Sequence, residues 1–193
     1  MKFVLFLVFL ITSFTKSMSS SQLSLPSIET LNETQGNPEK FQETVTPLLE
    51  KSPKLISELY SHLPFASYQQ MMENAKGILF TEFTQDERIG VINSHPRLGT
   101  DVSKLEGLSK IEQSYSGGEN KQSSASSWGE LNAAYESKFG FRFVIFVNKR
   151  PIAELVPIIE GILNDPNASK DSEVNRAIQA FLDIANDRLA KLT

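Results

Sequence analysis

The chain has 193 residues, of which 40% are apolar and 22% are charged, and this length suits one domain with a single core. It carries 19 Lys and Arg against 23 Asp and Glu, so its formal net charge is −4 and it has no basic surplus for binding nucleic acid. With no Cys and two His, disulfide scaffolds, thiol nucleophiles and Cys-based metal centres are excluded, and a multi-His metal site is disfavoured. We therefore expect chemistry based on carboxylates, histidine, arginine and hydroxyl groups.

Residues 1–20 have the layout of a secretory signal peptide: a positive charge, an apolar run and then small residues. The apolar run is shorter than the roughly 18 residues of a membrane-spanning helix. Sequons at Asn32 and Asn167 fit a secreted chain. Two alternatives stay open, since translation could start at Met18 and the apolar run could remain as an uncleaved anchor. In each case we expect the folded domain to span residues 21–193.

Three short helices are predicted next, from the spacing of apolar residues and from the residues that precede each helix. Asn37, Ser52 and Ser67 are suitable N-cap positions, and proline at the first helical position favours two of the starts. The predicted helices cover residues 38–50, 53–62 and 68–80.

A capping box, in which two residues three positions apart bond reciprocally to each other's backbone, is expected at Thr84 and Glu87. It opens a helix that buries Ile89 and Ile92. This helix should end at His95-Pro96, because the residue before a proline is disfavoured in helical conformation.

A second capping box, at Ser127 and Glu130, predicts a helix that runs to Gly140 as its C′ residue. The polar tract of residues 116–127 before it is expected to be a mobile connection.

The last helix is predicted over residues 172–191, where apolar residues recur at three- and four-residue intervals as a buried stripe. The stripe comprises Val174, Ile178, Phe181, Leu182, Ala185 and Leu189. Residues 141–147 resemble a strand by composition, but a single strand cannot form a sheet, so we expect a buried extended segment. The predicted fold is all-α, a single compact domain of about eight helices.

Five polar residues are candidates for chemistry. His95 lies at a helix end, where a side chain can line a cavity. Ser109, Glu112 and Gln113 have the spacing i, i+3 and i+4, which places them on one face of a helix that Gly117 could end. Arg188 borders the apolar stripe of the last helix. Taken singly, a helix cap, a solvated helix face and a surface arginine are the commoner explanations.

In combination, six segments of the chain resemble one family, the 2-oxo-4-hydroxy-4-carboxy-5-ureidoimidazoline (OHCU) decarboxylases of uric acid breakdown. The His-Pro, the Ser-x-x-Glu-Gln and the Tyr-x-x-x-Phe-Gly-Phe-x-Phe-Val-Ile patterns are specific together and in this order. The segments are LLEKSP at 48–53, LPFAS at 63–67, HPRLG at 95–99, SKIEQ at 109–113, the stretch 131–147 and the stretch 173–189.

The resemblance implies an all-α enzyme, usually a homodimer, that uses neither metal nor organic cofactor and converts OHCU to S-allantoin with loss of carbon dioxide. A functional link to a hydroxyisourate hydrolase, which supplies the substrate, is also implied. The catalytic residues of the family fall on His95 and Glu112. Its substrate-binding residues fall on Pro96, Ser109, Gln113, Phe141, Ile145 and Arg188.

The chain departs from the common family pattern in three respects. His95 and Glu112 are only 17 positions apart, and HPRLG replaces the more usual His-Pro-Asp-Leu-Ala-Gly. The chain ends in Lys-Leu-Thr and not in the peroxisomal Ser-Lys-Leu. Its N-terminus indicates the secretory pathway, whereas the resemblance indicates peroxisome or cytosol. A relative that has lost or changed its activity, and a secreted helical binding module that keeps only the fold, are the alternative readings.

Overall fold

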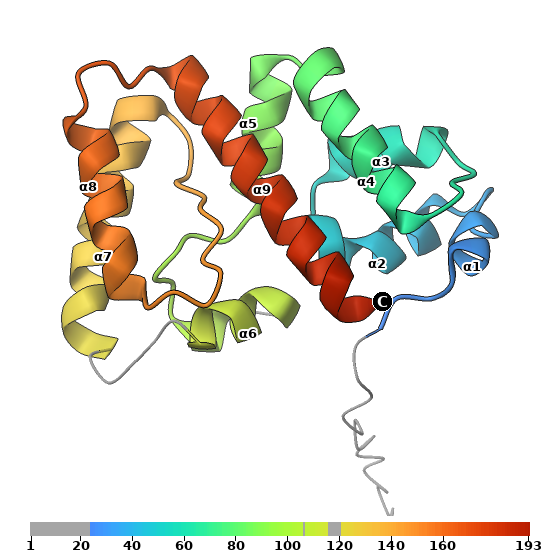
Figure 1. The fold of residues 1–193 in the computed structure, drawn as a ribbon, viewed down its shortest axis with the longest axis horizontal. Coiled ribbons are helices and arrows are strands. Elements are labelled where there is room, and N and C mark those ends of the chain that lie inside the picture. The colour runs from blue at the N-terminus through green and yellow to red at the C-terminus, as the bar shows by residue number, and fades with distance from the viewer. Residues whose placement is uncertain (1–23, 106, 116–120) are drawn as a thin grey trace, which may run out of the picture.

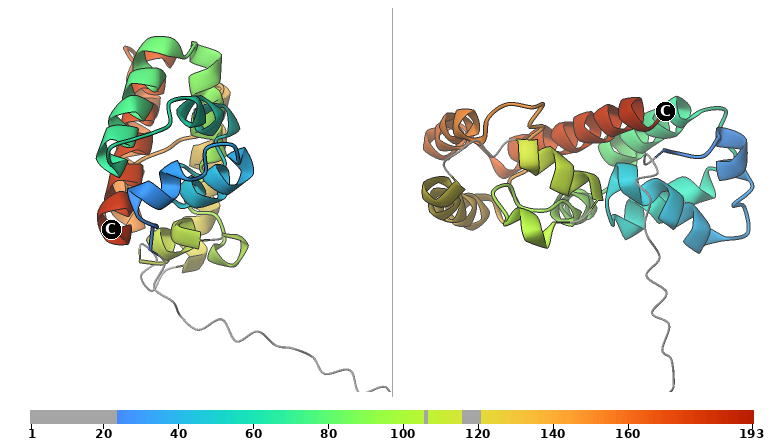
Figure 2. Two further views of the ribbon diagram at one scale, coloured as in Figure 1. Left: turned by 90° about the vertical axis from the view of Figure 1, so that its right-hand side faces the viewer. Right: turned by 90° about the horizontal axis from the view of Figure 1, so that it is seen from below.

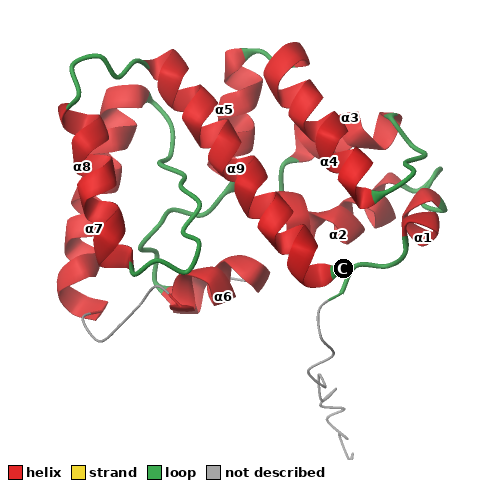
Figure 3. Cartoon of the chain, in the orientation of Figure 1, coloured by secondary structure: helices red, strands yellow, loops and turns green. Residues whose placement is uncertain are grey.

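The computed structural model describes residues 24–105, 107–115 and 121–193. Within these ranges the chain is helical and contains no strand, which confirms the predicted all-α single domain (Figure 3). The α-helices of this described part are α1 (Ile28–Asn32), α2 (Pro38–Leu49), α3 (Pro53–Ser61), α4 (Tyr68–Gly77), α5 (Gln85–Ser94), α6 (Gly107–Tyr115), α7 (Lys121–Phe139), α8 (Val156–Asn164) and α9 (Lys170–Leu192). None of the helices in these ranges is both long and apolar enough to cross a membrane.

The long C-terminal helix α9 organises the core. It runs across the molecule with α1 to α4 on one side and α7 and α8 on the other, as Figures 1 and 2 show, and it packs against α2, α4 and α5. All six residues of the predicted apolar stripe are buried, and the helix extends slightly beyond the predicted range. Because several helices cover this apolar stripe, helices that are far apart in the sequence meet around α9.

Most predicted helix starts are confirmed by their capping bonds. The side chain of Asn37 accepts a bond from a backbone N–H of α2, that of Ser67 accepts one from α4, and both bonds of the Thr84–Glu87 capping box are present. Ser52 precedes α3 as predicted, but its hydroxyl caps no N–H. It lies 2.6 Å from the Ser94 hydroxyl instead, and so links the start of α3 to the end of α5.

Three details of the predicted helices are wrong. The helix predicted over 68–80 ends as an α-helix at Gly77 and continues as a π-helix over Ile78–Glu82. In α5, Ile89 is only half-buried, and Val91 joins Ile92 in the core. The C-terminal boundary of α2 also differs, since the helix ends before Glu50.

The second predicted capping box is also wrong, because α7 begins at Lys121 and passes through Ser127 without a break. Residues 121–127 contain neither proline nor glycine, so nothing stops the helix from extending backward from the fully buried Trp128. The predicted connection is therefore helical from residue 121, and residues 116–120 lie outside the described residues. The C-terminal end of α7 is as predicted, since Gly140 follows the helix with φ 84°.

Residues 141–147 form the extended segment that the sequence predicts, with Phe141, Phe143 and Val144 buried and the other four residues half-buried. Phe141 and Phe143 pack edge-on against Tyr135, with ring centroids 5.7 and 5.1 Å apart. Side chains replace the partner strand that a sheet would supply: the Arg142 backbone N–H donates to Asn93 of α5, and Arg176 of α9 donates to the Val144 carbonyl. Two backbone groups of the segment are thus satisfied by side chains of α5 and α9.

Candidate active site

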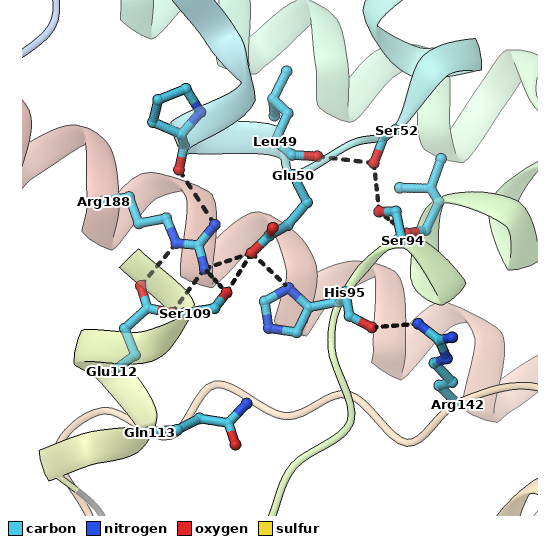
Figure 4. A network of polar contacts seen from close by, with 12 residues as sticks. Leu49, Glu50, Ser52, Ser94, His95, Ser109, Glu112, Gln113, Arg142 and Arg188 are labelled. Atoms are coloured by element: carbon cyan, nitrogen blue, oxygen red, sulfur yellow. Dashed lines mark hydrogen bonds and ion pairs between the residues drawn. The ribbon is translucent and has the colours of Figure 1, made fainter. Parts of the chain in front are cut away.

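The site is organised around Arg188 of α9, whose side chain is buried although it is charged; only 1% of the residue is exposed. Its Nε and Nη2 donate to the two carboxylate oxygens of Glu112, each at 2.7 Å. Nη2 also lies 2.8 Å from Glu50 Oε1 and 2.9 Å from the Ser109 hydroxyl, and Nη1 donates to the Pro47 carbonyl at 3.2 Å. Figure 4 shows this network. Such multiple pairing is what a buried guanidinium requires.

Helix α6 supplies three polar side chains on one face, as the spacing predicts. Ser109 and Glu112 contact Arg188, whereas Gln113 points toward the Arg97 carbonyl, with Nε2 at 3.4 Å. Gln113 is 9% exposed, and its Oε1 has no hydrogen-bond partner among the described residues. The predicted helix stop at Gly117 lies outside those residues.

Glu50 is the site residue that sequence reasoning missed. The prediction put it inside a helix, but the ring of Pro53 would clash with the carbonyl of residue 49 in a continuous helix, so α2 stops at Leu49. Glu50 then adopts a left-handed backbone conformation, with φ 54°. Its Oε1 accepts a 2.5 Å hydrogen bond from Ser109. The one available signal was its place in the LLEKSP segment, which the resemblance includes without assigning a role to the glutamate.

His95 follows the last residue of α5 in extended conformation, with ψ 140°, as expected before a proline. Its side chain is nearly buried, and its backbone carbonyl accepts a 3.0 Å bond from Arg142. Nδ1 lies 3.5 Å from Glu50 Oε1, on the same oxygen that Ser109 and Arg188 contact (Figure 4). The structure therefore joins the end of α2, the end of α5, α6 and α9 at one point.

Burial and charge set the protonation states of this cluster. Burial lowers the pKa of His95 to about 4, because the attraction of Glu50 offsets only part of the desolvation, so the imidazole is neutral at pH 7. Burial would raise the pKa of Glu50, but the charge of Arg188 and the hydrogen bonds from Ser109 and Arg188 hold it below its usual value. An ionised carboxylate facing Nδ1 favours a proton on that nitrogen, which leaves the lone pair on Nε2.

A cavity of about 420 Å³ lies against this cluster, with walls from His95-Pro96, α6, residues 143–149 and α9. Five of the residues that the resemblance nominates line it: His95, Pro96, Glu112, Gln113 and Ile145. Ser109 and Arg188 line an adjacent cavity of about 460 Å³ together with Glu50 and Pro96.

Phe141 belongs to neither of these cavity walls, and its side chain is part of the aromatic core. Among the described residues, no group of acidic or histidine side chains could hold a metal ion.

Comparison with known proteins gives consistent results. A family model described as OHCU decarboxylase matches residues 34–190. A 2-oxo-4-hydroxy-4-carboxy-5-ureidoimidazoline decarboxylase of Halalkalicoccus jeotgali is 27% identical over 86% of this chain and 91% of its own length. The corresponding decarboxylase of Amia calva is 30% identical over 66% of this chain and 75% of its own length.

Other relatives share only part of their length or only the fold. A uric acid degradation bifunctional protein of Bacillus subtilis is 23% identical over 78% of this chain but 30% of its own length. A crystal structure of OHCU decarboxylase in the presence of (S)-allantoin superposes with a TM-score of 0.60 at 23% identity, over 73% of this chain and 91% of that one. With the family match over most of its length, this chain belongs to the OHCU decarboxylase family.

Proposed function

We propose that this chain is a carboxy-lyase that converts OHCU to (S)-allantoin and carbon dioxide in urate degradation. The observation that carries the proposal is the neutral, buried His95, which lines a cavity of about 420 Å³ and lies 3.5 Å from Glu50 of the Arg188 network. The family match supports the choice of substrate.

The reaction breaks the bond between C4 of the imidazoline ring and its carboxylate, which leaves as carbon dioxide. The electron pair of that bond forms a C4=C5 double bond, and the pair displaced from the C5=N bond moves to the ring nitrogen, which takes up a proton. The ring itself therefore accepts the electrons. The C4 hydroxyl then loses its proton and becomes a carbonyl, and C5 gains a proton. Protonation of C5 from one face sets the S configuration.

The described geometry suggests a role for each polar residue. Nε2 of neutral His95 is suited to accept the proton of the C4 hydroxyl, because the Glu50 carboxylate, 3.5 Å from Nδ1, favours the ring proton on Nδ1. Glu112, fixed by Arg188, orients the hydroxyl or the imidazole. The Gln113 Oε1, which lacks a partner among the described residues, can accept an N–H of the ureido group or the ring amide.

The resemblance implies that Arg188 binds substrate, but its contacts favour a role in positioning other side chains. Its Nε and Nη2 already bond to protein acceptors, so a direct contact with substrate would use the second hydrogen of Nη1, whose partner is the Pro47 carbonyl. We therefore assign it chiefly to positioning Glu50 and Glu112.

The test is the rate of OHCU consumption, followed by ultraviolet absorbance after urate is oxidised and hydrolysed in place. The wild type should accelerate consumption well above spontaneous decay, and His95→Ala should lower kcat by about 10²–10⁴-fold, the usual contribution of a positioned base. Its circular dichroism spectrum should stay helical. Decay at the spontaneous rate with a folded wild-type protein would favour the alternative of a helical binding module that keeps the fold alone.

Two finer expectations also remain proposals. The signal-peptide pattern of residues 1–20 supports secretory targeting, and the exposed Asn167 is an accessible sequon, whereas the Asn32 amide bonds to the backbone of Phe65. The homodimer rests on the family resemblance, and sedimentation analysis of the purified protein tests it.

A further inference from the structure

Lys149 occupies a turn position that suits glycine better than lysine. The Val147 carbonyl accepts a bond from the Arg150 N–H at 3.0 Å, and the two central residues, Asn148 and Lys149, have φ 48° and 59°. Two positive φ values are the pattern of a type I′ turn, in which Asn is favourable at the first central position and Gly at the second. A lysine side chain at the second position strains the backbone, so we looked for what its charge does there.

Arg150 holds this turn in place beside the cavity of about 420 Å³. Its Nε donates to the Val147 carbonyl at 3.1 Å, and its Nη2 donates to the Phe146 carbonyl at 2.7 Å. Lys149 is exposed and also lines the cavity. The turn therefore places Lys149 at the solvent edge of the candidate active site.

The other charges of the cavity wall have partners. Glu112 is paired with Arg188, and Lys191 forms an ion pair with Asp187 one helical turn away. The side chain of Lys149 forms no ion pair or hydrogen bond within the described ranges of the chain. A cation without a counterion beside a largely apolar cavity attracts an anion.

We propose that Lys149 binds the carboxylate of the incoming substrate at the edge of the cavity; this inference rests on the proposed function. OHCU carries a carboxylate, whereas allantoin and carbon dioxide are uncharged, so the ion pair forms with the substrate and cannot form with the product. Lys149 thereby makes the site selective for substrate over product. Because the ion pair forms on binding and is retained until the bond between C4 and the carboxylate breaks, it stabilises bound substrate and transition state alike, so it lowers KM and leaves kcat unchanged.

The test compares Lys149→Gly, Lys149→Arg and the control Lys76→Gln, which removes one exposed positive charge on α4, away from the cavity. Lys149→Gly should raise KM for OHCU about threefold to fivefold, the upper part of the range of one exposed ion pair, and leave kcat unchanged. Inhibition by allantoin should not change. The Tm should stay equal or rise, because glycine relieves the turn. Lys149→Arg and Lys76→Gln should keep the wild-type KM.

A direct binding measurement separates this inference from the proposed function. Hydantoin-5-acetate, an anion, and neutral hydantoin are titrated calorimetrically into the wild type and Lys149→Gly. The inference predicts that the variant weakens binding of the anion alone, even if the wild type does not consume OHCU. Equal anion affinity in both proteins, an unchanged KM, or parallel losses for charged and neutral ligands would overturn it.

Discussion

Arg188→Gln gives the sharpest test of the buried network, because replacing a buried, paired arginine should cost far more unfolding free energy than replacing a surface arginine. The variant removes the cation that contacts both Glu50 and Glu112. Removing one partner of a buried ion pair costs about 3–5 kcal/mol of unfolding free energy, against about 0.5 kcal/mol for an ordinary surface change. The Glu50 and Glu112 side chains are 20% and 23% exposed, so solvent screens part of the penalty and we expect a loss near the lower limit, about 3 kcal/mol.

Urea unfolding at pH 7 and pH 4 provides the assay. Arg188 holds the pKa of Glu50 down, so without it this carboxylate can take up a proton, and the difference between wild type and variant should shrink as the pH falls. Arg97→Gln is the matched control: Arg97 donates to both oxygens of Glu136 at 2.5 and 2.7 Å, but its side chain is 50% exposed. It should cost at most about 1 kcal/mol. A loss for Arg188→Gln at pH 7 no larger than this control would refute the reasoning.

Three further predictions concern the groups around this network. The pKa of His95 is about 4 in the folded protein and 6.5 ordinarily, so between these pH values the unfolded chain binds an extra proton. The free energy of unfolding should therefore decrease as the pH is lowered from 6.5 to 4, by up to about 1.4 kcal/mol per pH unit. Urea titrations of His95→Asn should lack this contribution. Gly99→Ala should destabilise the protein by about 2 kcal/mol or more, because Gly99 has φ 77° and the added Cβ would lie 2.7 Å from Trp128 Cβ. Gly140→Ala is the control and should cost about 1 kcal/mol, because its added Cβ meets only the end of a lysine side chain. Similar thermal shifts for the two variants would contradict this. Glu50→Gln should lower kcat about 10–100-fold with little change in KM, since the neutral amide no longer favours the proton on Nδ1 of His95. A variant that turns over at the wild-type rate would remove Glu50 from the mechanism.

Sequence reasoning succeeded where the deciding interactions are local. Capping bonds join residues three positions apart, as at Asn37 and at Thr84 with Glu87, so the sequence alone contains the information. The apolar period of α9 likewise predicts its buried face without knowledge of its neighbours. The same local reasoning failed at Ser127, where a capping pattern lies inside a helix that continues on its N-terminal side.

The candidate site depends on contacts that no local pattern contains. The hydrogen bond from Arg188 to Pro47 joins residues 141 positions apart, and burial of Arg188 is tolerated because α2 and α6 both bring acceptors to it. Glu50 was invisible to periodicity because its role depends on leaving the helix with a left-handed backbone. Residue types could nominate His95 and Glu112 as candidates, but their connection through Glu50 and Arg188 required the fold.

The configuration of the product tests the central claim most directly, because spontaneous decay of OHCU yields racemic allantoin and only a chiral site can select one face of C5. Circular dichroism of OHCU generated in place from urate should show rapid growth of the (S)-allantoin signal with the wild-type protein, and no such signal with a folded His95→Ala variant. Racemic product in the presence of the wild type, or an undiminished (S)-allantoin signal with His95→Ala, would contradict the assignment of this cavity as the decarboxylase site.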